Sequence, residues 1–130
     1  MTLPPKARWR NSTTRKYGNK KVELDGYLFD SKREAVYYLE LKFRKKAGDV
    51  KEFEVKPKIY VYYRPDDLTI DWCEVPSKWG KETGTILLFT YTPDFKVGGK
   101  FIEVKGYATD YWKLKLKMLL AIRLPLEIVT

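Results

Sequence analysis

Residues 86–106 of this chain read ILLFTYTPDFKVGGKFIEVKG, and this segment carries the clearest secondary-structure pattern in the sequence. Two runs rich in β-branched and aromatic residues surround Gly98-Gly99, a dipeptide that favours a tight turn between antiparallel strands. The pattern predicts a long strand over residues 86–97 and a return strand over residues 100–105. A β-hairpin is therefore the first element that the sequence predicts.

The turn also sets the register of the hairpin and places two carboxylates opposite each other. Counting outward from the glycines, Phe95 faces Ile102 and Asp94 faces Glu103. Paired residues share one face of a hairpin, with Cβ atoms roughly 4.5–5.5 Å apart. Two carboxylates at this spacing repel each other, and a divalent cation bound between them removes the conflict. Their hard oxygen atoms suit Mg²⁺, and we expect Mn²⁺ to substitute for it.

Lys105 follows Glu103 at the spacing that returns a strand side chain to the same face. An ammonium group beside a metal site can activate a water molecule or stabilise the negative charge that develops on a phosphate. The opposite face of the hairpin is apolar and predicts a buried side made of Phe95, Val97, Ile102 and Val104. The plain alternative is that Asp94, Glu103 and Lys105 form a solvated polar face.

Upstream of the hairpin, residues 20–30 predict two short strands around Asp25-Gly26, followed by a helix. Ser31 and Glu34 fit a capping box, in which the serine accepts from the Glu34 amide and the glutamate reaches back. Gly48 is the expected C-terminal stop. The expected apolar face of this helix consists of Ala35, Tyr38, Leu39, Leu41 and Phe43.

Four further segments complete the predicted order of elements. Residues 50–63 predict extended structure with a bend at Pro57, and residues 64–84 predict an irregular insertion rich in proline and glycine. Residues 110–123 alternate like a strand, but their length and composition favour a helix capped by Thr109 or Asp110. Leu126–Val129 then forms a final strand. The order is helix, strand, hairpin, helix, strand.

The composition excludes several classes of function. The chain has 130 residues, enough for one domain with a modest core. It has no histidine, which excludes His-based triads, His–metal sites and HNH-type nuclease chemistry, and its single Cys73 excludes an intrachain disulfide and a cysteine cluster for zinc. No apolar run approaches the ~20 residues that span a membrane, so we expect a cytoplasmic protein. The absence of glutamine beside abundant Lys and Glu hints at a thermophilic source.

The net charge is +9, and much of it lies in residues 1–22, where no acid precedes Glu23. We predict a flexible basic arm over residues 1–19 that suits nucleic acid, with a solubilising tail as the alternative. The lysines of the second predicted helix can contact phosphates or simply face solvent. The candidates for DNA contact are Arg8, Arg10, Arg15, Lys16, Lys20, Lys32, Arg33, Lys113, Lys115 and Lys117.

Tyr91-Thr92-Pro93-Asp94 followed by Glu103-Val104-Lys105 resembles the Pro-Asp…Glu-x-Lys signature of PD-(D/E)XK nucleases. A wider set of segments is similar to a family of small phage-encoded endonuclease-like proteins, which are related to archaeal-type Holliday junction resolvases. These segments are Lys16–Lys20, Asp25–Ala35, Lys56-Pro57, Pro93–Phe95 and Glu103–Gly106. The resemblance covers nearly the whole chain apart from residues 1–15 and 64–84.

The resemblance implies an α/β protein with the restriction-endonuclease-like αβββαβ core, a mixed central sheet flanked by helices, in a single nuclease domain over residues 20–130. It implies Mg²⁺ held by Asp94, Glu103 and the Val104 carbonyl. Glu34 of the first helix is a further ligand, in competition with its capping role, and Lys105 activates water. It also implies a homodimer that cuts branched DNA, a four-way junction, in the host cytoplasm. The alternatives are a less selective repair or replication nuclease and a non-catalytic nucleic-acid-binding module.

Overall fold

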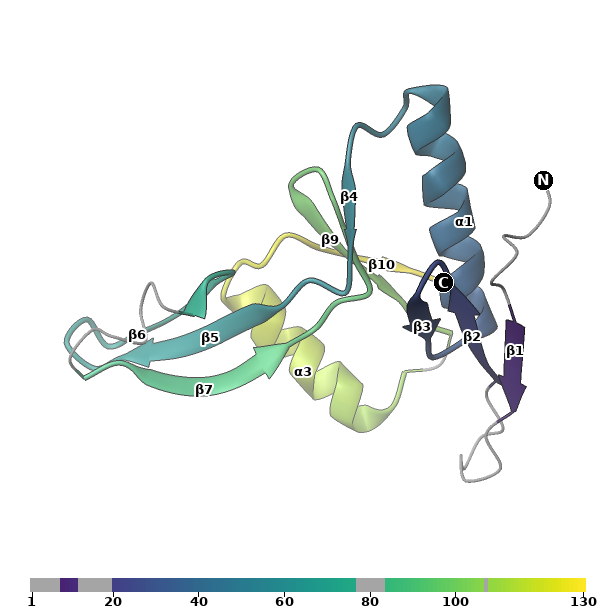
Figure 1. The fold of residues 1–130 in the computed structure, drawn as a ribbon. Coiled ribbons are helices and arrows are strands. Elements are labelled where there is room, and N and C mark those ends of the chain that lie inside the picture. Colours follow the sequence, from purple (N-terminus) through teal and green to yellow (C-terminus); the bar gives the residue numbers. More distant parts are fainter. Residues whose placement is uncertain (1–7, 12–19, 77–83, 107) are drawn as a thin grey trace. The chain divides into compact units, whose positions relative to one another are not determined.

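The computed structural model describes residues 8–11, 20–76, 84–106 and 108–130 (Figure 1). The predicted α/β class is confirmed: the described residues form two helices and three sheets, one of them mixed. The chain divides into two compact units, an N-terminal unit of residues 1–52 and a C-terminal unit of residues 53–130. The single nuclease domain expected over residues 20–130 stays a prediction.

The N-terminal unit begins with the antiparallel sheet β1 (Arg8–Asn11), β2 (Lys20–Leu24) and β3 (Tyr27–Phe29), in that order. The hairpin predicted around Asp25-Gly26 is confirmed, and φ of 50° and 86° at these residues is the geometry of a type I′ turn. We expected an irregular arm here, and this was wrong for β1, whose backbone pairs with the open edge of β2. Arg15 and Lys16 lie outside the described residues.

Helix α1 (Lys32–Ala47) starts and stops where the sequence predicts. The Ser31 Oγ accepts the Glu34 amide at 3.1 Å, and Gly48 ends the helix in the left-handed conformation with φ of 88°. The predicted apolar face is confirmed at Ala35, Tyr38 and Leu41, which are buried. Phe43 is 62% exposed, so its place on this face was wrong. Two residues along a helix turn the side chain by roughly 200°, which carries Phe43 away from Leu41.

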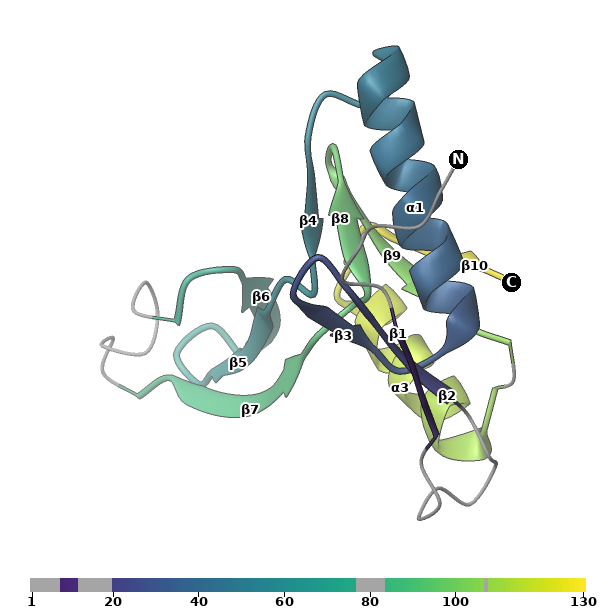
Figure 2. The ribbon, with the colours of Figure 1, turned by 45° about the vertical axis from the view of Figure 1, so that its right-hand side comes forward.

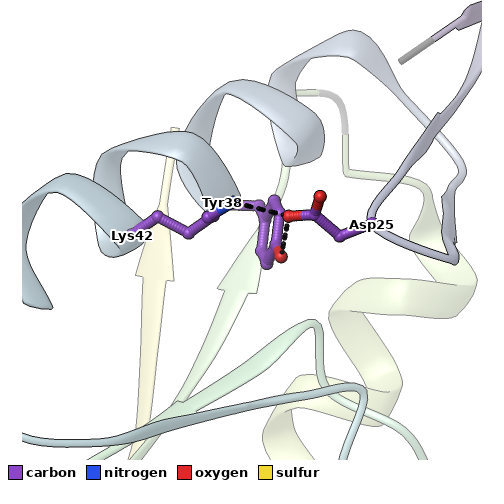
Figure 3. Close-up of polar contacts among 3 residues, drawn as sticks. All are labelled: Asp25, Tyr38 and Lys42. Atoms are coloured by element: carbon purple, nitrogen blue, oxygen red, sulfur yellow. Dashed lines mark hydrogen bonds and ion pairs between the residues drawn. The ribbon is translucent and has the colours of Figure 1, made fainter. Parts of the chain in front are cut away.

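A polar cluster joins the β2–β3 turn to α1 (Figure 3). Asp25 Oδ2 accepts from the Tyr38 hydroxyl at 2.6 Å and from Lys42 Nζ at 2.6 Å. Lys42 also lies over the Tyr38 ring, 5.6 Å from its centroid. Burial raises the pKa of Tyr38, and the hydrogen bond to Asp25 and the Asp25 charge raise it further. The hydroxyl therefore stays protonated and fixes the turn to the helix.

The C-terminal unit contains a mixed sheet in the order β10-β9-β8-β4 (Figure 2). Its strands are β4 (Phe53–Val55), β8 (Phe95–Val97), β9 (Lys100–Val104) and β10 (Leu126–Val129), and β10 runs parallel to β9 while the other pairs are antiparallel. The β8–β9 register pairs Phe95 with Ile102 and Val97 with Lys100. The hairpin register predicted from Gly98-Gly99 is thus confirmed.

A second, antiparallel sheet contains β5 (Ile59–Arg64) between β6 (Thr69–Cys73) and β7 (Ile86–Tyr91). It corrects two predictions. The insertion expected over residues 64–84 is not wholly irregular, because β6 pairs along β5; residues 77–83 lie outside the described part. The long strand expected over residues 86–97 is two strands in two sheets, because Pro93 between them has no N–H to continue a ladder.

Helix α3 (Asp110–Ala121) confirms the helix predicted over this segment, and the hydroxyl of Thr109 caps it by accepting the Trp112 amide at 3.1 Å. The helix packs against both sheets of its unit through a core of Ile59, Val61, Tyr91, Phe101, Trp112, Leu119 and Leu124. Phe101 shares the face of Glu103 and is buried, as is Ile102 on the opposite face. The hairpin was expected to have one core face, but β9 is an interior strand and is covered on both.

Neither helix in the described ranges is long and apolar enough to cross a membrane.

Candidate active site

Asp94 lies at the bend between β7 and β8, and hydrogen bonds hold both its side chain and its backbone. Its Oδ2 accepts the Val104 amide of β9 at 2.7 Å. Its carbonyl accepts the Lys56 amide, just beyond β4, at 2.9 Å. The aspartate is therefore fixed beside the residue that follows Glu103, in agreement with the register predicted from the turn.

Glu103 is a buried carboxylate on an interior strand, with 9% of its surface exposed. Its Oε1 accepts the hydroxyl of Tyr91 at 2.5 Å. Burial of a carboxylate is costly unless donors surround it. A distance this short is typical of a hydrogen bond in which the acceptor carries a charge.

Tyr91 is the last residue of β7 and is only 3% exposed. Burial raises its pKa well above the ordinary value, and the charge and hydrogen bond of Glu103 and the charge of Asp94 raise it further. The hydroxyl therefore keeps its proton and donates a hydrogen bond to Glu103. Glu103 belongs to β9, and Asp94 accepts the amide of the next residue, Val104, so both acids lie at this part of β9.

Two lysines lie against the aromatic side of the site. Lys105 Nζ is 4.9 Å from the centroid of the Trp112 ring, and Lys115 Nζ is 4.9 Å from that of Tyr91. The two rings are neighbours, with centroids 6.2 Å apart. Contact with an aromatic face holds an ammonium group in place while it keeps its charge. The site thus combines the two carboxylates held at β9 with two ammonium groups over a single aromatic pair.

The three lysines predicted as one DNA-binding group of α3 are separated by the helix. Lys113 and Lys117 are exposed and stand one turn apart, on the same side. Lys115 is half-buried and points roughly 200° away from Lys113, toward Tyr91. Residues two apart project to nearly opposite sides of a helix, so this division follows from the predicted helix, and the packing decides that the Lys115 side faces Tyr91.

Glu34 lies on α1 of the N-terminal unit and is buried. Its Oε2 accepts from the Ser31 hydroxyl at 3.1 Å, while that hydroxyl accepts the Glu34 amide. The structure thus shows the predicted exchange between serine and glutamate at the helix start, made here through the serine side chain. The metal role of Glu34 stays a prediction.

The other predicted DNA contacts all lie before residue 34 of the chain. Lys20, Lys32 and Arg33 are exposed, at the start of β2 and in the first turn of α1. Arg8 and Arg10 lie in β1, where the backbone is described. Their role, like that of Arg15 and Lys16, stays a prediction.

A family model described as "Protein of unknown function (DUF1064)" matches residues 14–124. The chain belongs to the DUF1064 family. The matched range includes the candidate-site residues of the C-terminal unit, from Tyr91 to Lys115, and also Glu34. No curated protein and no solved structure matches the chain.

The donor atoms of this DUF1064 protein fit Mg²⁺ by their chemistry. The described residues contain no group of three or more acidic, cysteine or histidine side chains placed to hold a metal. Mg²⁺ commonly takes only one or two carboxylates from a protein and completes its shell with water and substrate phosphate. Asp94 and Glu103 supply two carboxylates beside the Val104 backbone, which is sufficient for such a site.

Tyr91 and Trp112 were not predicted as parts of the site. Tyr91 and Asp94 were expected in one continuous strand, and that strand did not predict a contact between Tyr91 and Glu103. The available signal was Pro93, which interrupts the ladder and lets the chain turn so that the end of β7 faces β9.

Proposed function

We propose that this DUF1064 protein is a Mg²⁺-dependent endonuclease that hydrolyses phosphodiester bonds in branched DNA, with a four-way junction as its preferred substrate. The observation that carries the proposal is that β9 holds both acids, Glu103 as one of its residues and Asp94 through the Val104 amide, with Lys105 and Lys115 over the adjoining rings of Trp112 and Tyr91. Carboxylates suit a hard divalent cation, and ammonium groups suit a phosphate. A site with both is suited to phosphoryl hydrolysis.

The order of elements supports a PD-(D/E)XK core. Without the β5–β7 sheet, the elements from α1 onward run α1, β4, β8, β9, α3, β10, which is the order αβββαβ. The four strands of this set form one mixed sheet, and the two acids lie at its β8–β9 hairpin. The β5–β7 sheet is an insertion between β4 and β8.

Each side chain has a role in this proposal. Asp94, Glu103 and the Val104 carbonyl would hold the cation. Glu34 would be a further ligand, and only the family resemblance supports this role. Bound Mg²⁺ acts as a Lewis acid on the phosphate. Lys105 orients the attacking water and stabilises the charge that develops on the phosphate oxygens. The Trp112 ring limits where the Lys105 ammonium can move.

Affinity for DNA would come from the exposed cations, because contacts to phosphates do not depend on base sequence. Lys113 and Lys117 lie on the outer side of α3, and Lys20, Lys32 and Arg33 belong to the N-terminal unit. A homodimer would present two sites to a branched substrate. Exposed apolar side chains on β6 and β7 favour such an interface, namely Ile70, Ile86, Leu87 and Leu88.

The test compares cleavage of a synthetic four-way junction with cleavage of a linear duplex of matching sequence, in Mg²⁺. The wild type is compared with Asp94→Asn and with Asp66→Asn, a matched control at an exposed turn of the same unit. Paired nicks in the junction alone, lost in Asp94→Asn and kept in Asp66→Asn, support the proposal. Equal cutting of both substrates points to the less selective nuclease. Binding without cleavage in Mg²⁺ or Mn²⁺ points to the non-catalytic module.

A further inference from the structure

The hydroxyl of Tyr91 donates a hydrogen bond to Glu103, yet the proposed reaction gives this hydroxyl no task. We propose that Tyr91 is a positioning residue that fixes the Glu103 carboxylate in the orientation that binds the divalent cation. This inference rests on the proposed function, since it concerns the cation site of that function.

The contact fixes one oxygen of the carboxylate. The Tyr91 hydroxyl donates to Glu103 Oε1 at 2.5 Å, inside the core of the C-terminal unit. A glutamate side chain has several rotatable bonds, and holding it in one conformation has an entropic cost that would otherwise fall on cation binding. A hydrogen bond already formed in the protein removes most of that cost. Such partners of metal ligands typically account for 10–100-fold in metal affinity or activity.

Tyr91 can hold Glu103 because Tyr91 is itself held from several sides. Its backbone pairs with Ile59 at the end of β7. Its ring packs beside Trp112, and the ammonium group of Lys115 lies over it. The hydroxyl is therefore a fixed point against which the longer glutamate side chain is oriented.

If Tyr91 had a purely structural role, loss of its hydroxyl would lower the stability of the protein without a specific effect on cation affinity. Tyr91→Phe removes the hydroxyl and keeps the ring. Tyr62→Phe is the matched control: Tyr62 is also buried, lies on the neighbouring strand β5, and donates its hydroxyl to the Pro76 carbonyl at 3.1 Å. Each variant loses the donor of one hydrogen bond, which is buried for Tyr91 and part-buried for Tyr62, but only Tyr91→Phe changes a contact of Glu103.

The experiment is a calorimetric titration with Mn²⁺ alone on the full-length wild type, Tyr91→Phe, Tyr62→Phe and Asp94→Asn, with thermal unfolding of each variant as the test of folding. We expect Tyr91→Phe to weaken Mn²⁺ binding about 10–100-fold. We expect Tyr62→Phe to bind as the wild type does and Asp94→Asn to lose binding. Replacing Tyr91 with 4-aminophenylalanine, which keeps both the ring and a donor, should restore most of the affinity.

Two outcomes overturn the inference, and they are distinguishable. If Tyr91→Phe binds Mn²⁺ as the wild type does while Asp94→Asn does not, Tyr91 does not position Glu103, and the proposed function stands. If Asp94→Asn also binds as the wild type does, the cation site is absent and the proposed function fails with it. An equal loss in Tyr62→Phe and Tyr91→Phe shows a general effect of stability and also overturns the inference.

Discussion

The two compact units each contain a buried tyrosine that donates to a carboxylate, with a lysine over the tyrosine ring. In the N-terminal unit Tyr38 donates to Asp25 at 2.6 Å, and in the C-terminal unit Tyr91 donates to Glu103 at 2.5 Å. The difference is where the ammonium group lies. Lys42 Nζ is bonded to the Asp25 carboxylate itself, whereas Lys115 Nζ lies over the Tyr91 ring.

This difference separates a structural cluster from a candidate site. Asp25, with a side chain 30% exposed, has its charge balanced by Lys42 at 2.6 Å. Glu103 is more buried and accepts from a neutral hydroxyl, and a second acid, Asp94, is bonded to the amide of the next residue, Val104. Gathering negative charge in a buried place opposes folding, so we infer that it serves binding of a cation.

The largest expected difference between the two clusters follows from substitution of their carboxylates. Glu103→Gln should reduce the rate of DNA cleavage by more than about 10³-fold, since the Lewis-acid contribution of a cation is several kcal/mol. Asp25→Asn should leave the rate unchanged and lower the free energy of unfolding by about 1 kcal/mol, because it weakens a partly exposed cluster. Single-turnover cleavage and urea unfolding measure the two effects. A similar loss of cleavage in both variants would contradict the distinction.

The next effect concerns the two lysines that lie over tyrosine rings. Lys115→Met should reduce cleavage about 10–100-fold with a smaller change in DNA affinity, because its charge lies over the ring of Tyr91, the partner of Glu103. Lys42→Met should leave cleavage unchanged. Lys113→Met on the exposed side of α3 is a second control and should affect only affinity. Rate and binding, measured separately on one junction substrate, decide this; equal rates in all three variants would remove Lys115 from the site.

Tyr38 and Tyr91 should make similar contributions to the loss of stability at alkaline pH, although they belong to different kinds of cluster. Both folded-state pKa values are raised above the ordinary value. Below about pH 10 both folded and unfolded chains hold the proton; above it only the folded chain does, so stability falls as pH rises. Tyr38→Phe and Tyr91→Phe should each reduce this fall by about 1.4 kcal/mol in total between pH 9 and 11, because the slope reaches its full value only above the unfolded-state pKa of about 10. Urea unfolding across pH 9 to 11 tests it (an interval set by the ordinary tyrosine pKa of about 10); unchanged slopes would contradict the buried donor role.

The smallest expected effect is that of substitutions at the exposed lysines on DNA affinity. Lys113→Gln and Lys117→Gln should each lower the dependence of DNA affinity on salt by about one unit of slope, and should do so equally for junction and duplex. Lys42→Gln, whose charge is engaged by Asp25, should leave the slope unchanged. Binding measured over a range of salt concentrations gives the slopes. An effect confined to the junction would show that these lysines read its shape.

The predicted elements that the structure confirms share one property, that local residues specify them. Asp25-Gly26 and Gly98-Gly99 fix turns because few other residues tolerate their backbone angles. Ser31 and Thr109 begin helices because their hydroxyls accept amides from the next turn. Each of these interactions closes within a few residues, so the sequence alone is enough to predict it.

The errors share the opposite property. The pairing of β6 with β5 and of β1 with β2 depends on edges formed by other parts of the chain. The break at Pro93 was visible, but the separation of β7 and β8 into two sheets was not. Tyr91 entered the site only because that separation turns the end of β7 toward Glu103.

Local sequence was enough to predict the β8–β9 hairpin, its register, the approach of Asp94 to β9, both ends of α1 and the start of α3, because turns and caps are short-range interactions. Only the tertiary structure decided that Tyr91 donates to Glu103, that Lys115 leaves the row of exposed lysines on α3, and that β9 is buried on both faces. The physical reason is that burial and long-range hydrogen bonds depend on which elements pack together. That packing belongs to the whole chain and cannot be predicted from local sequence patterns.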